Sequence, residues 1–121
     1  MLLKNRKIIA VDFDGTLDEK DVFPDFSKPN LWLINLLKRM KRDENAELIL
    51  WTCREDDVLD DAINWCCDFG LTFDAINANV PEIVKRYGKN GRKPAADIYI
   101  DEKSIQPEML KKIMLANGGK L

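Results

Sequence analysis

Four short apolar runs are spread along this chain, and each fits a strand buried on both faces. They cover residues 7–12, 47–52, 73–76 and 96–101. Elsewhere apolar positions recur three or four residues apart, which predicts helices from near Pro29 to Arg42, from Glu55 to Gly70, after Pro81 and after Pro107. Strands that alternate with helices indicate right-handed βαβ units. The sequence therefore predicts an α/β fold, a doubly wound parallel sheet with helices on both faces.

Local signals refine this pattern. Asn79 is placed to cap the short helix that begins at Pro81, and Gly88 to end it. The polar segment from Asp18 to Lys28 fits neither period and is interpreted as a flap after the first strand. The three tryptophans, Trp32, Trp51 and Trp65, stand in apolar patterns, so we expect them to pack rather than to bind a ligand.

The first strand delivers two carboxylates into a glycine turn, in the string Asp12-Phe13-Asp14-Gly15-Thr16. Side chains alternate along a strand, so Asp12 and Asp14 are expected on one side, at the carboxyl end where open α/β sheets bind their ligands. Two like charges this close favour a metal cation or a shared proton. The alternative is a solvated Asp-Gly turn that closes a hairpin.

Other polar residues stand at the ends of the remaining strands. Thr52 ends the second strand, Asp101 and Glu102 end the fourth, and Lys93 precedes the fourth. In a parallel sheet these ends share one edge, so the residues converge with Asp12. Such a set fits phosphoryl chemistry: Asp12 as nucleophile, Asp14 as acid and base, Asp101 as a Mg²⁺ ligand, and Thr52 and Lys93 on the phosphate oxygens.

Composition narrows the function classes. With 121 residues, 45% of them hydrophobic, the chain is expected to form one domain, residues 1–121. A net charge of −2 gives no sign of nucleic-acid or membrane partners, and the start of the chain lacks the pattern of a signal peptide, so we expect a cytoplasmic protein. The absence of histidine excludes His-based catalysis, and the three cysteines lack metal-ligand spacing.

At this point the chain resembles the haloacid dehalogenase (HAD) superfamily of phosphohydrolases. Asp12-Phe13-Asp14-Gly15-Thr16, Thr52, Lys93 and Asp101-Glu102 look like its four motifs, in order and in strand context. The resemblance implies a Rossmann-like core and a phosphatase that forms an aspartyl-phosphate on Asp12. It also implies Mg²⁺ held by Asp12, the backbone carbonyl of Asp14, and Asp101. Its last motif often reads Asp-Asp, so Glu102 is a possible further metal ligand.

The intervals between the motifs leave no room for a cap domain, so the resemblance is to capless members. Such proteins often act on bulky phosphorylated substrates, small molecules or macromolecules, or use a neighbouring subunit as a lid, which makes a homo-oligomer possible.

Several assignments stay open at the level of sequence. Lys85, Lys89 and Arg92 compete with Lys93 for the phosphate-binding role, and Arg54 either touches substrate or forms a surface ion pair. Asp97 is expected in a turn or cap, away from the site. The alternative functions are a phosphoacceptor domain, as in response regulators, and a catalytically idle regulatory domain that binds phosphate and Mg²⁺.

Overall fold

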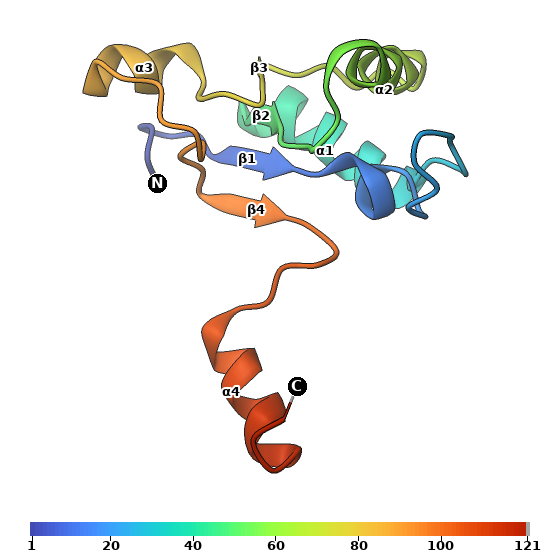
Figure 1. Cartoon of the computed structure of the whole chain (residues 1–121). Coiled ribbons are helices and arrows are strands. Elements are labelled where there is room, and N and C mark those ends of the chain that lie inside the picture. The colour runs from blue at the N-terminus through green and yellow to red at the C-terminus, as the bar shows by residue number, and fades with distance from the viewer. Residues whose placement is uncertain (121) are drawn as a thin grey trace.

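Strands and helices alternate along the chain (Figure 1), as the sequence pattern predicts. The computed structural model describes residues 1–120. Its elements are β1 (Ile8–Val11), α1 (Leu31–Glu44), β2 (Glu47–Leu50), α2 (Asp56–Asp68), β3 (Ala75–Ile76), α3 (Pro81–Tyr87), β4 (Ile98–Ile100) and α4 (Pro107–Ala116). Each strand is shorter than its apolar run, although flanking residues such as Asp12 and Trp51 still donate backbone hydrogen bonds to the neighbouring strand.

The sheet has the strand order β3-β2-β1-β4, and every pair is parallel. β1 is central: its Ala10 pairs with Ile49 of β2 on one side and with Tyr99 of β4 on the other. All three carboxyl ends therefore meet at one edge of the sheet, which confirms the predicted α/β fold with a parallel, Rossmann-like sheet.

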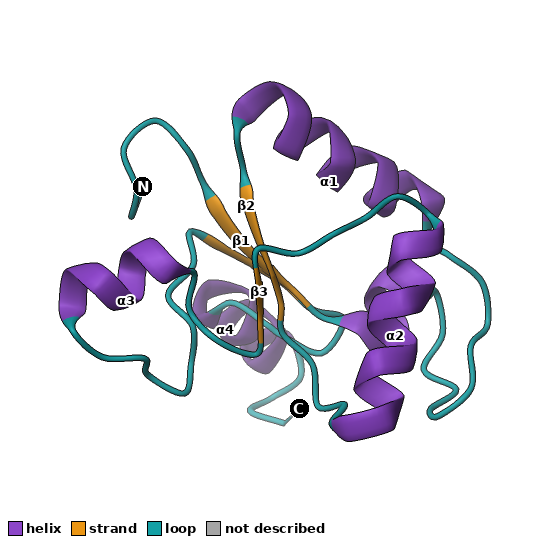
Figure 2. Cartoon of the chain, turned by 90° about the horizontal axis from the view of Figure 1, so that it is seen from above, coloured by secondary structure: helices purple, strands orange, loops and turns teal. Residues whose placement is uncertain are grey.

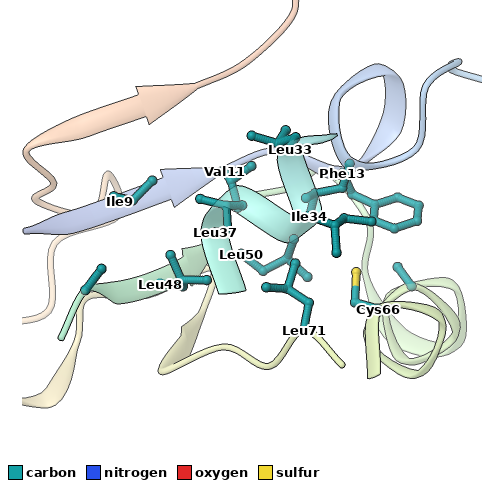
Figure 3. Packing of buried hydrophobic residues seen from close by; sticks show 13 residues of the cluster. Ile9, Val11, Phe13, Leu33, Ile34, Leu37, Leu48, Leu50, Cys66 and Leu71 are labelled. Carbon is teal, nitrogen blue, oxygen red and sulfur yellow. The ribbon is translucent and has the colours of Figure 1, made fainter. Parts of the chain in front are cut away.

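Helices lie on both sides of the sheet (Figure 2). The side chains of β1 alternate between two apolar clusters, one on each side. Ile9 and Val11 pack against α1 and α2 (Figure 3), while Ile8 and Ala10 pack on the side of α3. The four residues of β1 are fully buried, which explains the unbroken apolar run. Cys66 of α2 is a small residue of the first cluster, and its burial raises the pKa of the thiol to about 12.

The last helix, α4, stands apart from the sheet beyond β4 (Figure 1) and has no buried residue. No helix within residues 1–120 is long and apolar enough to cross a membrane.

Two local predictions were wrong. Asn79 does not cap α3, where Val80 occupies the N-cap position. Its side chain instead accepts a hydrogen bond from the Ala95 backbone N–H at 2.6 Å and so holds the loop before β4. Trp32 does not pack inside: it is 75% exposed, because it lies on the outer face of α1. Trp65 and Trp51 do pack against the two apolar clusters.

Candidate functional site

A cavity of about 500 Å³ lies at the carboxyl edge of the sheet. We call it the carboxylate pocket; its lining residues are Asp12, Asp14, Asp21, Phe23, Thr52, Cys53, Arg54, Asp101, Glu102 and Lys103. The structure thus brings together six of the seven residues that the sequence singled out. These six come from the loops that follow β1, β2 and β4, as expected of a parallel sheet.

Asp12 follows β1 directly and is held in register by its backbone N–H, which donates to the carbonyl of Ile100 at 3.0 Å. Its Oδ1 accepts a hydrogen bond from the Phe13 backbone N–H at 2.7 Å. Burial raises the pKa of Asp12 to about 6. The hydrogen bond from Phe13 opposes this shift, and the charges of Asp101, Asp14 and Glu102 add to it. The pocket is therefore a place where a cation would relieve carboxylate repulsion.

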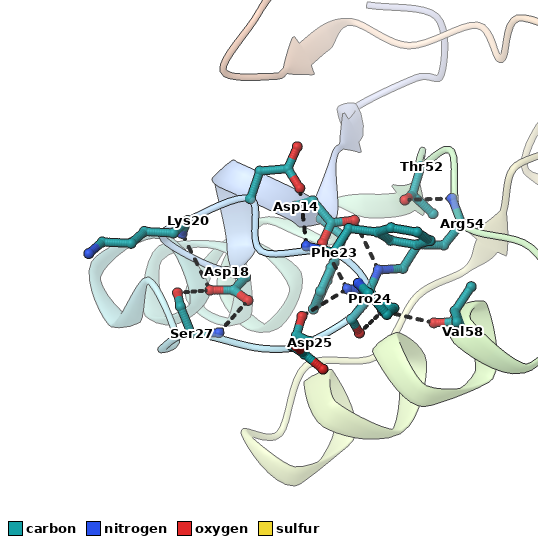
Figure 4. A network of polar contacts seen from close by, with 12 residues as sticks. Asp14, Asp18, Lys20, Phe23, Pro24, Asp25, Ser27, Thr52, Arg54 and Val58 are labelled. Atoms are coloured by element: carbon teal, nitrogen blue, oxygen red, sulfur yellow. Dashed lines mark hydrogen bonds and ion pairs between the residues drawn. The ribbon is translucent and has the colours of Figure 1, made fainter.

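Asp14 is paired with Arg54, which reaches it from the loop after β2 (Figure 4). The guanidinium donates through Nε to Oδ2 at 2.9 Å and through Nη2 to Oδ1 at 2.8 Å. Because the Arg54 side chain is only 1% exposed, a surface ion pair, one of the two predictions for this residue, was wrong. The hydrogen bond from Arg54 to Asp14 raises the pKa of Arg54, so the guanidinium stays charged.

Thr52 lies on the loop that follows β2. Its backbone N–H donates to Oδ1 of Asn77 at 2.8 Å, and its Oγ1 accepts from the backbone N–H of Arg54 at 3.2 Å. Asn77 is a residue that sequence reasoning missed. Its left-handed backbone, with φ of 49°, is a conformation that asparagine tolerates better than most residues, and its position after β3 was the available signal.

Asp101 and Glu102 follow β4, which lies beside β1 on the side away from β2, and both line the carboxylate pocket. Oδ1 of Asp101 accepts from the Lys103 backbone N–H at 2.7 Å. The carboxylate of Glu102 lies against Gly15, where any Cβ would clash with it. Gly15 has φ of +78°, and this backbone conformation is what requires glycine here, since the flexible Glu102 side chain can move away from a Cβ.

Lys93 is the one predicted residue that lies outside the carboxylate pocket. Its Nζ is 4.8 Å from the centroid of the Tyr99 ring, and it lines a separate cavity of about 720 Å³ together with Trp51 and Asp101. Lys85, Lys89 and Arg92 do not line the carboxylate pocket either. Within residues 1–120, every cation of that pocket has a carboxylate partner: Arg54 pairs with Asp14, and Lys103 lies near Asp21 and Glu102.

The segment from Asp18 to Lys28 forms the flap that the sequence suggested (Figure 4). Two of its residues, Asp21 and Phe23, line the carboxylate pocket. Asp18 closes its base: this fully buried carboxylate accepts from the backbone N–H groups of Ser27 at 2.8 Å and Lys28 at 3.2 Å, and from the Ser27 hydroxyl. Sequence reasoning missed this role of Asp18. An aspartate nine residues before a serine has no local pattern that reveals it.

The carboxylate oxygens of the pocket suit Mg²⁺ better than they suit a metal that is bound entirely by protein side chains. No group of three His, Cys, Asp or Glu side chains within residues 1–120 is placed to hold a metal ion. Mg²⁺ commonly uses one or two carboxylates and keeps several waters. Asp12 and Asp101 both line the pocket and offer two carboxylates, whereas the Asp14 carboxylate is engaged by Arg54.

Asp97 lies at the opposite end of β4 and has a structural role, as predicted. It accepts from the backbone N–H groups of Leu2 at 2.9 Å and Ile8 at 2.7 Å, so it ties the amino-terminal segment to the sheet.

Comparison with known proteins identifies a relative of this chain but assigns no activity to either protein. No protein-family model and no curated protein matches the chain. Among solved structures, a conserved protein from Bacteroides thetaiotaomicron is 35% identical in sequence, with a TM-score of 0.71 over 96% of this chain and 94% of that one. This identity over nearly the whole of both chains shows common descent. The chain belongs to the same family as this conserved protein of Bacteroides thetaiotaomicron.

Proposed function

We propose that the protein is a cytoplasmic, Mg²⁺-dependent phosphomonoester hydrolase of the HAD type. The observation that carries this proposal is the convergence of Asp12, Asp14, Thr52 and Asp101 on one pocket at the carboxyl edge of a parallel sheet. Their order along the chain and the strand context match the motifs of that superfamily. The family relationship itself assigns no chemistry.

In the proposed reaction Asp12 is the nucleophile. Its Oδ1 is occupied by the Phe13 backbone N–H, so Oδ2 attacks phosphorus, and the bond from phosphorus to the leaving oxygen breaks. For this step Asp14 must take up a proton on a lone pair that Arg54 leaves free, and it then gives that proton to the leaving oxygen. A water then attacks the aspartyl-phosphate and loses a proton to Asp14, which releases inorganic phosphate and restores the Asp12 carboxylate.

The other residues hold the phosphate. The Thr52 hydroxyl donates to a non-bridging oxygen. Asp12, Asp101 and the Asp14 carbonyl would hold Mg²⁺, which would supply positive charge to the phosphate oxygens. Lys93 would bind the phosphate only after its ammonium group leaves the Tyr99 ring. Glu102 would contact the metal through a water molecule. With only the flap beside it, the site accepts a phosphorylated small molecule or macromolecule.

The test is phosphate release from an aryl phosphate and a panel of phosphorylated metabolites, with Mg²⁺ or with EDTA. We expect release that requires Mg²⁺ and falls by at least about 10³-fold in Asp12→Asn. Asp60→Asn, which changes an exposed aspartate of α2, is the matched control and should retain full activity. Turnover that survives in Asp12→Asn, or in EDTA, would contradict the proposal.

One observation favours a phosphoacceptor as the second candidate. Both oxygens of Asp14 accept from Arg54, and the carboxylate pocket contains no unpaired cation within residues 1–120, so hydrolysis of a phosphorylated Asp12 could be slow. A phosphorylated Asp12 that persists for hours in Mg²⁺ would favour this candidate, whereas decay within a turnover would favour the hydrolase.

A further inference from the structure

Arg54 carries the most heavily engaged buried charge around the carboxylate pocket. Its side chain is 1% exposed, and two of its three nitrogens serve Asp14. A buried guanidinium is costly unless its N–H groups are satisfied, so the partners of the remaining N–H groups show what the residue holds in place.

Those partners belong mainly to the flap. Nη2 donates to the carbonyl of Asp25 at 3.2 Å, and Nη1 to the carbonyl of Pro24 at 3.4 Å. Nη1 also donates to the Val58 carbonyl, in the first turns of α2, at 3.1 Å. One guanidinium thus connects the Asp14 carboxylate, the tip of the flap and the start of α2 (Figure 4).

Aromatic rings enclose the same guanidinium. Its central carbon lies 4.8 Å from the centroid of Phe13, 5.2 Å from that of Phe23 and 5.0 Å from that of Phe26. Phe13 belongs to the motif itself, whereas Phe23 and Phe26 belong to the flap. These cation–π contacts exclude water from the ion pair and hold the flap against it.

We propose that Arg54 is a positioning residue that joins Asp14 and the flap into one unit, so that the acid–base carboxylate is correctly oriented only when the flap is closed. The catalytic half of this proposal rests on the proposed phosphatase function; the structural half does not. Lysine cannot replace arginine here, because a single ammonium cannot form the two parallel bonds to Asp14 and also reach two carbonyls of the flap.

The catalytic half is tested with Arg54→Lys on two phosphate esters, one with an alkyl and one with an aryl leaving group. A misplaced Asp14 matters most where the leaving oxygen needs a proton. We expect kcat/KM to fall about 10²-fold for the alkyl ester and about tenfold or less for the aryl ester. Arg42→Lys, which changes an exposed arginine paired with Asp43, is the control and should match wild type.

A combined variant separates positioning from general loss of structure. If Arg54 acts through Asp14, then Arg54→Lys in an Asp14→Asn background should cost little further activity. Equal losses on the two esters, or losses that multiply in the double variant, would overturn the proposal.

The structural half is measured by hydrogen exchange of flap residues 18–28, with no substrate present. We expect these amides to exchange at least about tenfold faster in Arg54→Lys, while the strands stay protected. If that variant does not fold, Phe23→Leu, which removes one partly exposed ring from Arg54, is used instead and should also speed exchange in the flap. Unchanged exchange in the folded variant used overturns the proposal.

The two experiments distinguish a failure of the Arg54 proposal from a failure of the proposed phosphatase function. A wild-type protein that releases no phosphate from any substrate would overturn the phosphatase and, with it, the catalytic half. Faster flap exchange in the variant would still support Arg54 as the residue that holds the flap to Asp14.

Discussion

At Asp12, burial and three neighbouring carboxylates raise the pKa to about 6, against 3.8 for an unperturbed aspartate. Between these two values the folded state keeps a proton that the unfolded chain has released, so the contribution of Asp12 to stability declines as pH rises from about 4 to about 6. Above about pH 6 the Asp12 carboxylate is ionised in the folded protein, and its buried charge lowers the free energy of unfolding. Residues chosen for function often carry such a cost.

Asp12→Asn should therefore stabilise the metal-free protein at high pH. We expect it to raise the free energy of unfolding by about 1 to 2 kcal/mol more at pH 8 than at pH 4, because asparagine carries no charge in either state. Urea unfolding in EDTA at the two pH values measures this. An equal effect of the substitution at both pH values would rule out a raised pKa at Asp12, and Asp60→Asn should show no such dependence.

The two tryptophans on α1 and α2, Trp32 and Trp65, should differ strongly in how much they contribute to stability. Trp65 lies 5.2 Å from Phe13, 5.6 Å from Phe26 and 4.9 Å from Phe69, measured between ring centroids, whereas Trp32 is 75% exposed. We expect Trp65→Ala to lower the free energy of unfolding by about 3 to 5 kcal/mol and Trp32→Ala by less than about 1 kcal/mol. Denaturant unfolding of the two variants measures these losses. Comparable losses of stability in both would contradict the buried packing of Trp65.

Prediction from sequence worked at residues whose role is local. Asp12, Asp14 and Asp101 were found because each directly follows a recognisable strand or stands in a turn motif. Arg54 was a candidate because it follows Thr52. Its pairing with Asp14 and the roles of Asp18 and Asn77 depend on partners between 9 and 40 residues away, which no local pattern reveals. Lys93 was placed by its distance along the chain from β4, which does not fix the direction of a long side chain.

Among the elements, the flap has two anchors of different kinds. Asp18 closes its base by accepting from the backbone of Ser27 and Lys28, and Arg54 holds its tip. Helices and strands were predictable because apolar periodicity reports burial directly, whereas the flap was visible in the sequence only as an aperiodic segment. What closes an aperiodic segment is decided by buried polar contacts, which periodicity does not encode.

Asp18→Ala should loosen the base of the flap. The substitution leaves two backbone N–H groups without their acceptor, so we expect a loss of about 1 to 3 kcal/mol in stability and faster tryptic cleavage after Lys20. Limited proteolysis measures the cleavage. Asp25→Ala, in the same flap but with an exposed side chain, is the control; cleavage at the same rate in both variants would contradict this role of Asp18.

For the molecule as a whole, the parallel sheet is what turns separate sequence positions into one pocket. Asp12, Thr52 and Asp101 are far apart along the chain, yet the register of β1 with β2 and β4 places them at one edge. The fold class was predictable from the alternation of strands and helices. The position of α4, apart from the sheet, was not, since its apolar spacing resembles that of a packed helix.

Mg²⁺ should stabilise the folded chain, since it relieves repulsion among carboxylates that the unfolded chain keeps apart. At a concentration ten times its dissociation constant the gain is about 1.4 kcal/mol, visible as a higher Tm at pH 8. Asp12→Asn should lose most of this gain. An equal rise in Tm in the variant, or the same rise with NaCl at matched ionic strength, would place the ion elsewhere.

The most direct measurement is to trap the covalent intermediate. The protein is mixed with an aryl phosphate and Mg²⁺, quenched in acid within the first turnover, and analysed by intact mass and peptide mapping. The account predicts one added phosphoryl group, located on Asp12 and absent from Asp12→Asn. Release of the aryl group with no phosphoryl group on Asp12, or with one on another residue, would contradict it.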